Sequence, residues 1–422
     1  MTLLNATVLN TTTLTSVPIE TSWITAYAVV FATAFMVALA TTPVVRFIAR
    51  KYDVVDHPDL VRKHHKKPVA YLGGLAIFIG WFAGIAASYL TGLDLAGDHA
   101  FPLMLVIGAG VITFTGLVDD VIPGVQARQK IGGQLFAAAA LTSQRVGFDL
   151  TETLYGLVHL YPNETVIYCS ATCLVAIIVL GGCNAVNLID GLDGLSSGVV
   201  AIAMASFLAI AVVAADQPEG FELLADHPNR VVLALATLGA LAGFLPFNWN
   251  PASIFMGDAG SLLLGFLSVS AILLMGDVGN YSLKLVTASL VVFAVPITDT
   301  SLAIIRRKLR GQPIFSPDSQ HLHHLLRRSG LSVKQSVLTM YAGGLLFGAI
   351  GIAMIAFRLR WRTSIGIVAI VYAIIMLVAF RYGAHCLGQD QAMAQAEPEI
   401  KPEPESTPST ETPSPTNAPP TG

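Results

Sequence analysis

Carboxylate and amide side chains gather in three short stretches that interrupt strongly apolar sequence. The longest stretch is Asn184–Leu195, and the other two are Leu117–Asp120 and Phe255–Ser261. An Asp near the centre of a membrane helix costs about 2.5 to 3.5 kcal/mol on insertion scales, so ionisable residues in such places point to function by default. A polar turn between two spans would explain any one of these stretches, but their recurrence predicts a shared site.

The residue types in these stretches indicate chemistry on a phosphate with a metal ion. Adjacent Asp119 and Asp120 point in different directions on a helix, so one can bind a metal or activate a nucleophile while the other takes a different partner. Asp258 lies in Gly257–Ser261, where small residues let the backbone approach a ligand and the following helix presents free N–H groups to phosphate. Because carboxylates beside phosphate usually hold Mg²⁺, we expect Mg²⁺ here, with Mn²⁺ as an alternative.

Two further polar residues each have two interpretations. Lys130 lies at the far end of the loop that follows Asp119 and Asp120, where it could contact a phosphate or could simply belong to a basic cytoplasmic loop. Asn187 could contact the edge of a base or sugar, or it could cap a helix. The sequence leaves both pairs of alternatives open.

Three histidines stand close together late in the chain, beside two arginines. They are His321, His323 and His324, followed by Arg327 and Arg328. The His-x-His spacing occurs in zinc sites, but no Cys or clear fourth ligand lies nearby, so zinc is disfavoured. Binding of an anionic substrate is the favoured interpretation. A basic cytoplasmic loop would explain the arginines but not the histidines.

A basic stretch, Arg62–Lys67, precedes the second apolar segment and contains Lys63 and His65. Basic residues at the inner leaflet attract anionic lipid headgroups by about 1 kcal/mol each. The same charges could instead hold a lipid phosphate at the site, and both interpretations stay open.

The elements that must position these residues are membrane helices. Of the 422 residues, 54% are hydrophobic and 12% are charged, whereas soluble domains average roughly 25% charged residues. A membrane helix needs about 20 mostly apolar residues, and we expect an all-α polytopic membrane protein with about eleven such helices. The expected spans are Trp23–Ile48, Leu72–Leu90, Phe101–Val118, Ile131–Thr142, Val166–Gly182, Leu195–Ala215, Val231–Phe247, Leu262–Met275, Leu285–Ile305, Val337–Phe357 and Ser364–Phe380.

The distribution of Lys and Arg predicts the orientation of these spans. Short loops rich in Lys and Arg stay in the cytoplasm, and the two richest loops follow Ile48 and Ile305. The amino terminus is therefore expected outside and the carboxyl terminus in the cytoplasm, with every polar stretch at a cytoplasmic helix end. The three arginines that follow Phe357 would lie outside, against the rule.

The two ends of the chain differ from the apolar region between them. Residues 1–22 are polar and rich in Thr, and we expect an external tail there. Residues 23–385 are expected to form the multi-span domain with its cytoplasmic loops. Residues 386–422 are rich in Pro, Glu and Thr and cannot bury a core, so they are predicted to be a disordered cytoplasmic tail.

Five motifs follow one another through the apolar region. They are Arg62-Lys63-x-His65-x-x-Pro68 with Gly73-Gly74, Val118-Asp119-Asp120, Asn187-Leu-Ile-Asp190-Gly-Leu-Asp193-Gly194, Phe255-Met256-Gly257-Asp258-Ala259-Gly260-Ser261, and His321-Leu-His323-His324. In this order they closely resemble the polyprenyl-phosphate N-acetylhexosamine-1-phosphate transferases, membrane enzymes of bacterial cell-envelope synthesis and of the first step of eukaryotic N-glycosylation.

The resemblance implies a reaction and a role for each motif. A polyprenyl phosphate attacks the sugar-linked phosphorus of a UDP-N-acetylhexosamine, giving a polyprenyl diphosphate-sugar and UMP with Mg²⁺ required. The implied roles are base or nucleophile for Asp119, metal or phosphate carboxylates for Asp120 and Asp258, nucleotide contacts for Asn187, Asp190 and Asp193, and phosphate or sugar binding for Lys63 and the histidines, His65 among them. Such a transfer depends mostly on positioning and electrostatics.

The last motif also bears on the donor. Its His-x-His-His form is more similar to the branch that uses UDP-N-acetylglucosamine than to the muramoyl-pentapeptide branch, which has three consecutive histidines. One departure is that Val69–Leu72 intervenes before Gly73, where the family often has a basic residue, so a contact of that residue is in doubt. The resemblance implies a bacterial plasma membrane enzyme with a cytoplasmic active site, an undecaprenyl phosphate acceptor, membrane lipid as surroundings and no nucleic acid partner. Whether the protein is a homodimer stays open.

Three other functions compete with this one. The muramoyl-pentapeptide transferases of the same family share most of the motifs. An intramembrane prenyltransferase would need a second Asp-rich motif besides Asn187-x-x-Asp190-x-x-Asp193, and Asp258 stands alone. A proton-coupled transporter would place carboxylates within the spans and on both sides of the membrane. Only Asp299 lies inside an expected span in that way, and it could be a buried structural acid.

Overall fold

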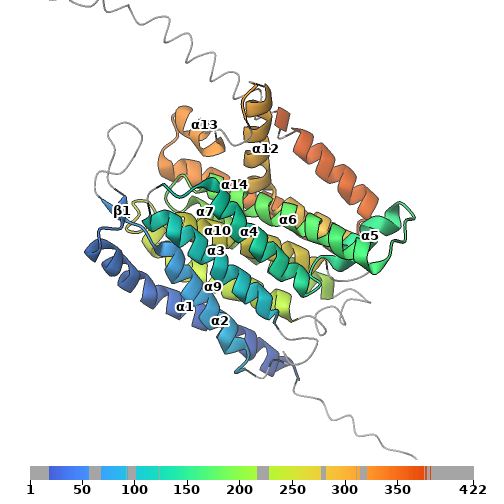
Figure 1. Ribbon diagram of the computed structural model, residues 1–422, viewed down its shortest axis with the longest axis horizontal. Helices are drawn as coiled ribbons and strands as arrows, with labels where there is room; N and C mark the ends of the chain where they lie inside the picture. The colour runs from blue at the N-terminus through green and yellow to red at the C-terminus, as the bar shows by residue number, and fades with distance from the viewer. Residues whose placement is uncertain are drawn as a thin grey trace, which may run out of the picture.

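The computed structural model describes residues 19–56, 68–91, 93, 101–122, 124–215, 228–276, 282–309, 311–313, 321–374, 376–377 and 381. Lys63, His65 and the expected carboxyl-terminal tail lie outside these ranges. Nearly all of the described secondary structure is helical, which confirms the all-α class (Figure 1).

The named elements follow one another in chain order. They are α1 (Ile19–Lys51), β1 (Val55–Asp56), β2 (Val69–Ala70), α2 (Gly73–Ser88), α3 (Leu103–Val121), α4 (Ala127–Ser143), α5 (Phe148–Leu157), α6 (Glu164–Ile189), α7 (Leu195–Ala215), α9 (Asn229–Asn248), α10 (Gly257–Met275), α11 (Ser282–Val292), α12 (Ala294–Leu309), α13 (Leu322–Arg328) and α14 (Val333–Ala356). A further short apolar helix covers Trp361–Ile374.

Within the described ranges, seven helices are long and apolar enough to cross a membrane: α1, α3, α6, α7, α9, α10 and α14. Helices α11 and α12 would make an eighth span, bent by 72°. All eight coincide with expected spans, so the protein is a multi-pass membrane protein. The expected spans at Leu72–Leu90 and Ser364–Phe380 are shorter apolar helices, and Ile131–Thr142 lies within the 17-residue helix α4. The count of eleven and the orientation stay predictions.

Helix α10 is the central helix of the bundle and is buried along almost its whole length (Figure 1). It contacts α2, α3, α6, α7, α9 and α11. Small residues permit this packing, as is common between membrane helices: a Cβ on Gly74 of α2 would lie 2.1 Å from the nitrogen of Gly260, and one on Gly116 of α3 would lie 2.4 Å from Ala259. The amino end of α10, which carries Asp258, is therefore fixed between α2 and α3.

A small sheet secures the segment that enters α10. Strands β1 and β2 pair antiparallel, and Ala70 of β2 also forms a parallel bridge with Ile254. The Phe255 nitrogen donates to the Ala70 carbonyl at 2.8 Å, and the Gly73 nitrogen donates to the Phe255 carbonyl at 2.9 Å. These hydrogen bonds satisfy backbone groups that would otherwise be buried without partners, and they hold Phe255 against the start of α2.

Candidate active site

Lys130 joins the ends of three helices at one ionic cluster. Its Nζ lies 2.6 Å from Asp119 Oδ2, at the end of α3, and it also contacts Asp258 Oδ2, at the start of α10. The three side chains are 22 to 27% exposed, so a ligand can reach them. The ammonium group thus lies between two predicted site carboxylates, and its contact with a phosphate stays a prediction.

Asp120 points away from this cluster and caps helix α10. Its Oδ1 accepts a hydrogen bond from the Asp258 nitrogen at 2.7 Å, and its Oδ2 accepts one from the Ala259 nitrogen at 3.0 Å. Carboxylates are favourable at helix N-termini because they satisfy unpaired N–H groups and the positive end of the helix dipole. Asp119 and Asp120 therefore do have different partners, as their adjacency predicts, and Asp120 as a metal ligand stays a prediction.

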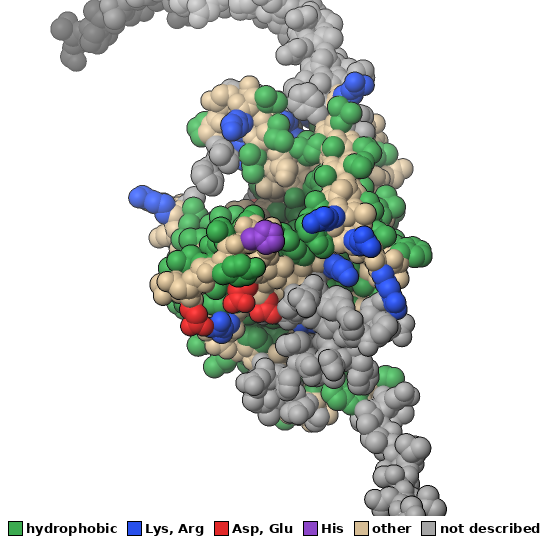
Figure 2. All heavy atoms as spheres, turned by 90° about the vertical axis from the view of Figure 1, so that its right-hand side faces the viewer, with side chains coloured by type: hydrophobic (Ala, Val, Ile, Leu, Met, Phe, Trp, Pro, Cys, Tyr) green, Lys and Arg blue, Asp and Glu red, His purple; other side chains and the backbone are tan. Residues whose placement is uncertain are grey.

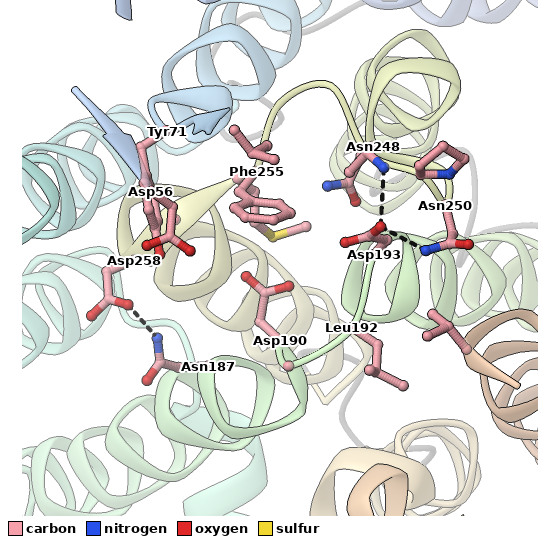
Figure 3. A pocket seen from close by; sticks show the side chains of 17 residues that line it. Asp56, Tyr71, Asn187, Asp190, Leu192, Asp193, Asn248, Asn250, Phe255 and Asp258 are labelled. Atoms are coloured by element: carbon pink, nitrogen blue, oxygen red, sulfur yellow. Dashed lines mark hydrogen bonds between the residues drawn. The ribbon is translucent and has the colours of Figure 1, made fainter. Parts of the chain in front are cut away.

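Asn187 connects α6 to the same carboxylate. Its Nδ2 donates to Asp258 Oδ1 at 2.9 Å and lies 2.9 Å from Ser261 Oγ, one turn further along α10. Asp258 is thus held on one oxygen by Lys130 and on the other by Asn187. Figure 3 shows the contact with Asn187. Asn187 thus orients a carboxylate, and because it also lines the cavity described below, its contact with a base or sugar edge stays a prediction.

Asp190 follows α6 directly and lies beside the entry to α7. Its Oδ1 accepts a hydrogen bond from Ser196 Oγ at 2.8 Å. Burial of the carboxyl raises its pKa to about 7 from its ordinary value of 3.8, although the Ser196 hydrogen bond acts in the opposite direction, and the neighbouring charges of Asp258 and Asp120 raise it further. A bound cation would lower the pKa of Asp190 again, because it favours the charged carboxylate.

Asp193 is bound to the segment between α9 and α10. Its Oδ2 accepts hydrogen bonds from Asn250 Nδ2 at 2.8 Å and from the Ala252 nitrogen at 3.0 Å. The neighbouring Gly194 nitrogen donates to Asn248 Oδ1 at 3.2 Å, and its carbonyl accepts from the Tyr341 hydroxyl. The loop between α6 and α7 is therefore fixed from two sides.

These residues surround a cavity of about 400 Å³. Its described lining comprises Asp56, Val69, Tyr71, Asn187, Asp190, Gly191, Leu192, Asp193, Asn248, Asn250, Pro251, Ala252, Phe255, Met256, Gly257, Asp258 and Val333. Figure 3 shows the side chains of Asp190, Asp193 and Asp258 around the space in front of the Phe255 ring. Figure 2 shows acidic and basic side chains gathered on one face of the molecule with a histidine nearby.

The charges of the lining indicate that an anionic ligand needs a cation there. Four of the described lining residues are Asp and none is Lys, Arg or His, while Lys130 stands at the border beside Asp258. Among the described residues, no three His, Cys, Asp or Glu side chains are arranged to hold a metal ion by themselves. Mg²⁺ commonly uses one or two carboxylates together with waters and substrate phosphates, and Asp258 with Asp190 suits that kind of site.

The histidines lie next to the cavity loop, outside the cavity lining. His323 is 2% exposed, and a Cβ on Gly191 would lie 2.3 Å from its Nε2, so its ring covers the Gly191 backbone. Burial, and after it the neighbouring His324, lowers the pKa of His323 to about 3, so this ring is neutral. Both of its ring nitrogens are buried without a hydrogen-bond partner among the described residues. His321 pairs with Asp299.

Sequence reasoning missed several residues of the cavity. Asp56 and Tyr71 come from the small sheet and its exit, and Asn248 and Asn250 come from the end of α9. Burial raises the pKa of the Tyr71 hydroxyl, so that side chain is a neutral hydrogen-bonding group. The sequence did contain a signal for the asparagines, because two amides next to Pro251 mark a turn just before the Phe255 motif.

Comparisons with known proteins show which sequences this chain is similar to. The profile of glycosyl transferase family 4 matches residues 102–275, which include Asp119, Asp190 and Asp258. The chain is 35% identical, over 77% of its length and 84% of the relative, to a probable undecaprenyl-phosphate N-acetylglucosaminyl 1-phosphate transferase from Bacillus subtilis. It is 34% identical to a decaprenyl-phosphate N-acetylglucosaminephosphotransferase from Mycobacterium tuberculosis, over 82% of this chain and 87% of the relative. A phospho-N-acetylmuramoyl-pentapeptide-transferase from Bacillus cytotoxicus is 30% identical to it, over 76% of this chain and 94% of the relative.

Proposed function

The chain belongs to the polyprenyl-phosphate N-acetylhexosamine-1-phosphate transferases of glycosyl transferase family 4, and we propose that it transfers N-acetylglucosamine-1-phosphate from UDP-N-acetylglucosamine to a polyprenyl phosphate, releasing UMP. The observation that carries this proposal is the cluster of Lys130, Asp119 and Asp258 at the edge of the acidic cavity. It offers a cation and two carboxylates where a diphosphate and a lipid phosphate would meet.

Mg²⁺ is part of the proposal. Asp258 and Asp190, which both line the cavity, would hold the ion, and the ion would neutralise the phosphate oxygens and the charge that develops in transfer. The carboxylates of the cavity support the presence of Mg²⁺. Four Asp side chains line the cavity, and without a cation they would repel a diphosphate. Mn²⁺ uses the same oxygen ligands and should substitute.

Asp119 is the residue we assign to the acceptor. It is 22% exposed and shares Lys130 with Asp258, whereas both oxygens of Asp120 accept backbone hydrogen bonds. Asp119 takes the proton of the acceptor phosphate, an oxygen of that phosphate attacks the sugar-linked phosphorus, and the bond from this phosphorus to the oxygen of UMP breaks. Lys130 stabilises the negative charge on the transferred phosphoryl group.

The nucleotide end of the donor fits the opposite part of the cavity. Phe255 presents an aromatic ring to the cavity, and the polar side chains of Asp193 and Asn250 lie at the same cavity (Figure 3). An aromatic face with a few directed polar groups is a common way to bind a nucleobase. The sugar-linked phosphate would then lie toward Asp258.

The choice of N-acetylglucosamine rests on the relatives' names and on the form of the histidine motif. The two more similar relatives described above are named for N-acetylglucosamine transfer, and the muramoyl-pentapeptide transferase is a third, at lower identity. The His321-Leu-His323-His324 form of the histidine motif also favours UDP-N-acetylglucosamine as the donor. Muramoyl-pentapeptide transfer is therefore the second candidate function.

We also propose that the site faces the cytoplasm of a bacterium and that the product feeds a cell-envelope polysaccharide. UDP-sugars are cytoplasmic, and the richest Lys and Arg loops fall at the same helix ends as the cluster. A homodimer is compatible with this arrangement.

The test is UMP release by the purified protein in detergent with undecaprenyl phosphate and Mg²⁺. We expect release from UDP-N-acetylglucosamine, and little from UDP-N-acetylgalactosamine or the muramoyl-pentapeptide donor. Release should require both the lipid and the metal, and it should be lost in Asp119→Asn and Asp258→Asn. Release from the muramoyl-pentapeptide donor alone would replace the proposal with the second candidate, and no release from any donor by folded protein would reject both.

A further inference from the structure

A buried acid outside the cavity holds the start of the histidine helix. Asp299 is 0% exposed and lies on α12, the second half of the bent helix pair. Its Oδ2 is 2.7 Å from His321 Nδ1, and its Oδ1 accepts a hydrogen bond from the Leu322 nitrogen at 2.6 Å. Both carboxylate oxygens are thus used to hold the first residues of α13.

The same helix reaches the cavity loop one residue later. His323 lies over Gly191, so closely that a Cβ on this glycine would be 2.3 Å from the imidazole Nε2. Gly191 stands between Asp190 and Asp193, whose side chains line the cavity. Asp299 is therefore connected to the cavity carboxylates through α13 and the Gly191 backbone.

The cost of this arrangement argues against a purely apolar packing role. Burying a carboxylate is unfavourable unless it is fully paired, and an apolar side chain would fill the same volume without that cost. An apolar side chain, however, could not fix the rotation of α13, because it could accept neither the His321 nor the Leu322 hydrogen bond. The carboxylate provides a defined orientation, which matters for a helix of only seven residues.

We propose that Asp299 is a positioning residue for donor binding: by holding His321 and Leu322, it sets α13 so that His323 covers Gly191 and orients the Asp190–Asp193 loop. The proposal rests on the proposed transferase function for its kinetic part. Its structural part, the connection between Asp299 and the loop, holds for the protein without substrate.

Two substitutions separate hydrogen bonding from charge. In Asp299→Asn, the amide oxygen can still accept from the Leu322 nitrogen, and the amide nitrogen can donate to His321 Nδ1 once that ring carries its proton on Nε2. In Asp299→Ala, both hydrogen bonds are lost. Ser289→Ala is the matched control, because Ser289 is a buried polar residue of the same bent pair whose Oγ has no partner among the described residues.

The first measurement is hydrogen–deuterium exchange of the full-length protein in detergent, without substrate. Asp299→Ala should speed exchange about tenfold in the peptides that cover residues 321–329 and 189–194, while Asp299→Asn and Ser289→Ala should stay within about threefold of the wild type. Unchanged exchange at residues 189–194 in Asp299→Ala would overturn the proposal. So would equal effects of the Asn and Ala substitutions.

The second measurement is steady-state kinetics with both substrates varied. Asp299→Ala should raise the KM for the UDP-sugar about tenfold and leave the KM for the polyprenyl phosphate within about twofold, because the loop it orients is at the donor end. A variant that merely unfolds in part would lower kcat with both KM values unchanged, and that result would overturn the positioning role. If the wild type releases no UMP, the proposed function fails by itself, whereas the exchange experiment still decides whether Asp299 controls the loop.

Discussion

The carboxylate of Asp120 caps helix α10, which carries Asp258 in its first turn: its Oδ1 lies 2.7 Å from the Asp258 nitrogen and its Oδ2 lies 3.0 Å from the Ala259 nitrogen. Asp120 therefore holds the start of α10, the helix that carries the Asp258 carboxylate. Asp119, the neighbour of Asp120 in sequence, has a different task, since it shares Lys130 with Asp258.

This difference predicts that Asp119 and Asp120 variants fail in different ways. Asp120→Ala should lower the stability of the protein by about 1 to 2 kcal/mol, because two N–H groups at the start of α10 lose their acceptor. Asp119→Ala should change the melting temperature little and abolish UMP release. Thermal melting followed by tryptophan fluorescence, with UMP release on the same preparations, checks both. A stable Asp120→Ala protein would contradict the capping role.

Lys130 should be needed for transfer more than for folding. Replacing it with Met keeps most of its length but removes the charge between Asp119 and Asp258, so kcat should fall about 100- to 1,000-fold, as when one stabilising donor is removed from a transition state. Lys130→Arg retains the charge and should recover part of the activity. If Lys130→Met releases UMP at more than about a tenth of the wild-type rate, the lysine is not the phosphate contact we assign.

The raised pKa of Asp190 predicts that the free energy of unfolding depends on pH. Its folded pKa is about 7, against an ordinary value of 3.8, so the folded protein binds this proton more tightly than the unfolded chain. The resulting stabilisation is complete below pH 3.8 and is lost as the pH rises through 7. Asp190→Asn removes the titration.

In thermal melts without metal, we compare the melting temperature of Asp190→Asn with that of the wild type. The variant's melting temperature minus the wild type's should be about 2 to 5 °C larger at pH 8 than at pH 5. Ser196→Ala is a useful control, because it removes the hydrogen bond to Asp190 and keeps the carboxyl. A constant difference between the two proteins across this pH range would show that Asp190 has an ordinary pKa.

Close helix packing at α10 predicts that one glycine is indispensable and another is not. A Cβ on Gly74 would lie 2.1 Å from the Gly260 nitrogen, so Gly74→Ala must move α2 away from α10 and should destabilise the protein by about 1 to 3 kcal/mol. Gly181 of α6 has open space around it, and Gly181→Ala should leave stability equal or slightly higher. Melting temperatures of both variants, at matched expression, decide this. Equal melting temperatures would contradict the packing.

The sequence predicted the helices and the polar stretches well because both depend on local composition. Asp119, Asp190 and Asp258 interrupt apolar sequence, and the bilayer makes such interruptions unfavourable, so the sequence alone identifies them as candidate site residues. The agreement of the long apolar helices with expected spans has the same origin. Helix α4 was harder to interpret, because Arg128 and Lys130 precede an apolar run of modest length.

The roles within the site depend on contacts between distant segments, and for that reason the sequence could not assign them. Nothing near Asp120 indicates that it caps a helix that starts at Gly257. Asp56 enters the cavity through a two-residue strand, which forms because it pairs with β2 and not because of any local propensity. The sequence suggested that Asp299 could be a buried structural acid, and the structure confirms its burial, but its hydrogen-bond partners His321 and Leu322 could not be inferred from the sequence.

The central claim is that the sugar moves together with its phosphate, and one labelling measurement tests it directly. UDP-N-acetylglucosamine carrying ³²P in the sugar-linked phosphate is incubated with the protein, undecaprenyl phosphate and Mg²⁺, and the lipid is extracted with butanol. The account predicts that ³²P enters the lipid fraction in equal amount to N-acetylglucosamine, and that neither enters it with Asp258→Asn. Sugar in the lipid fraction without ³²P, which stays with soluble nucleotide, would contradict the account, because it would mean transfer of the sugar alone.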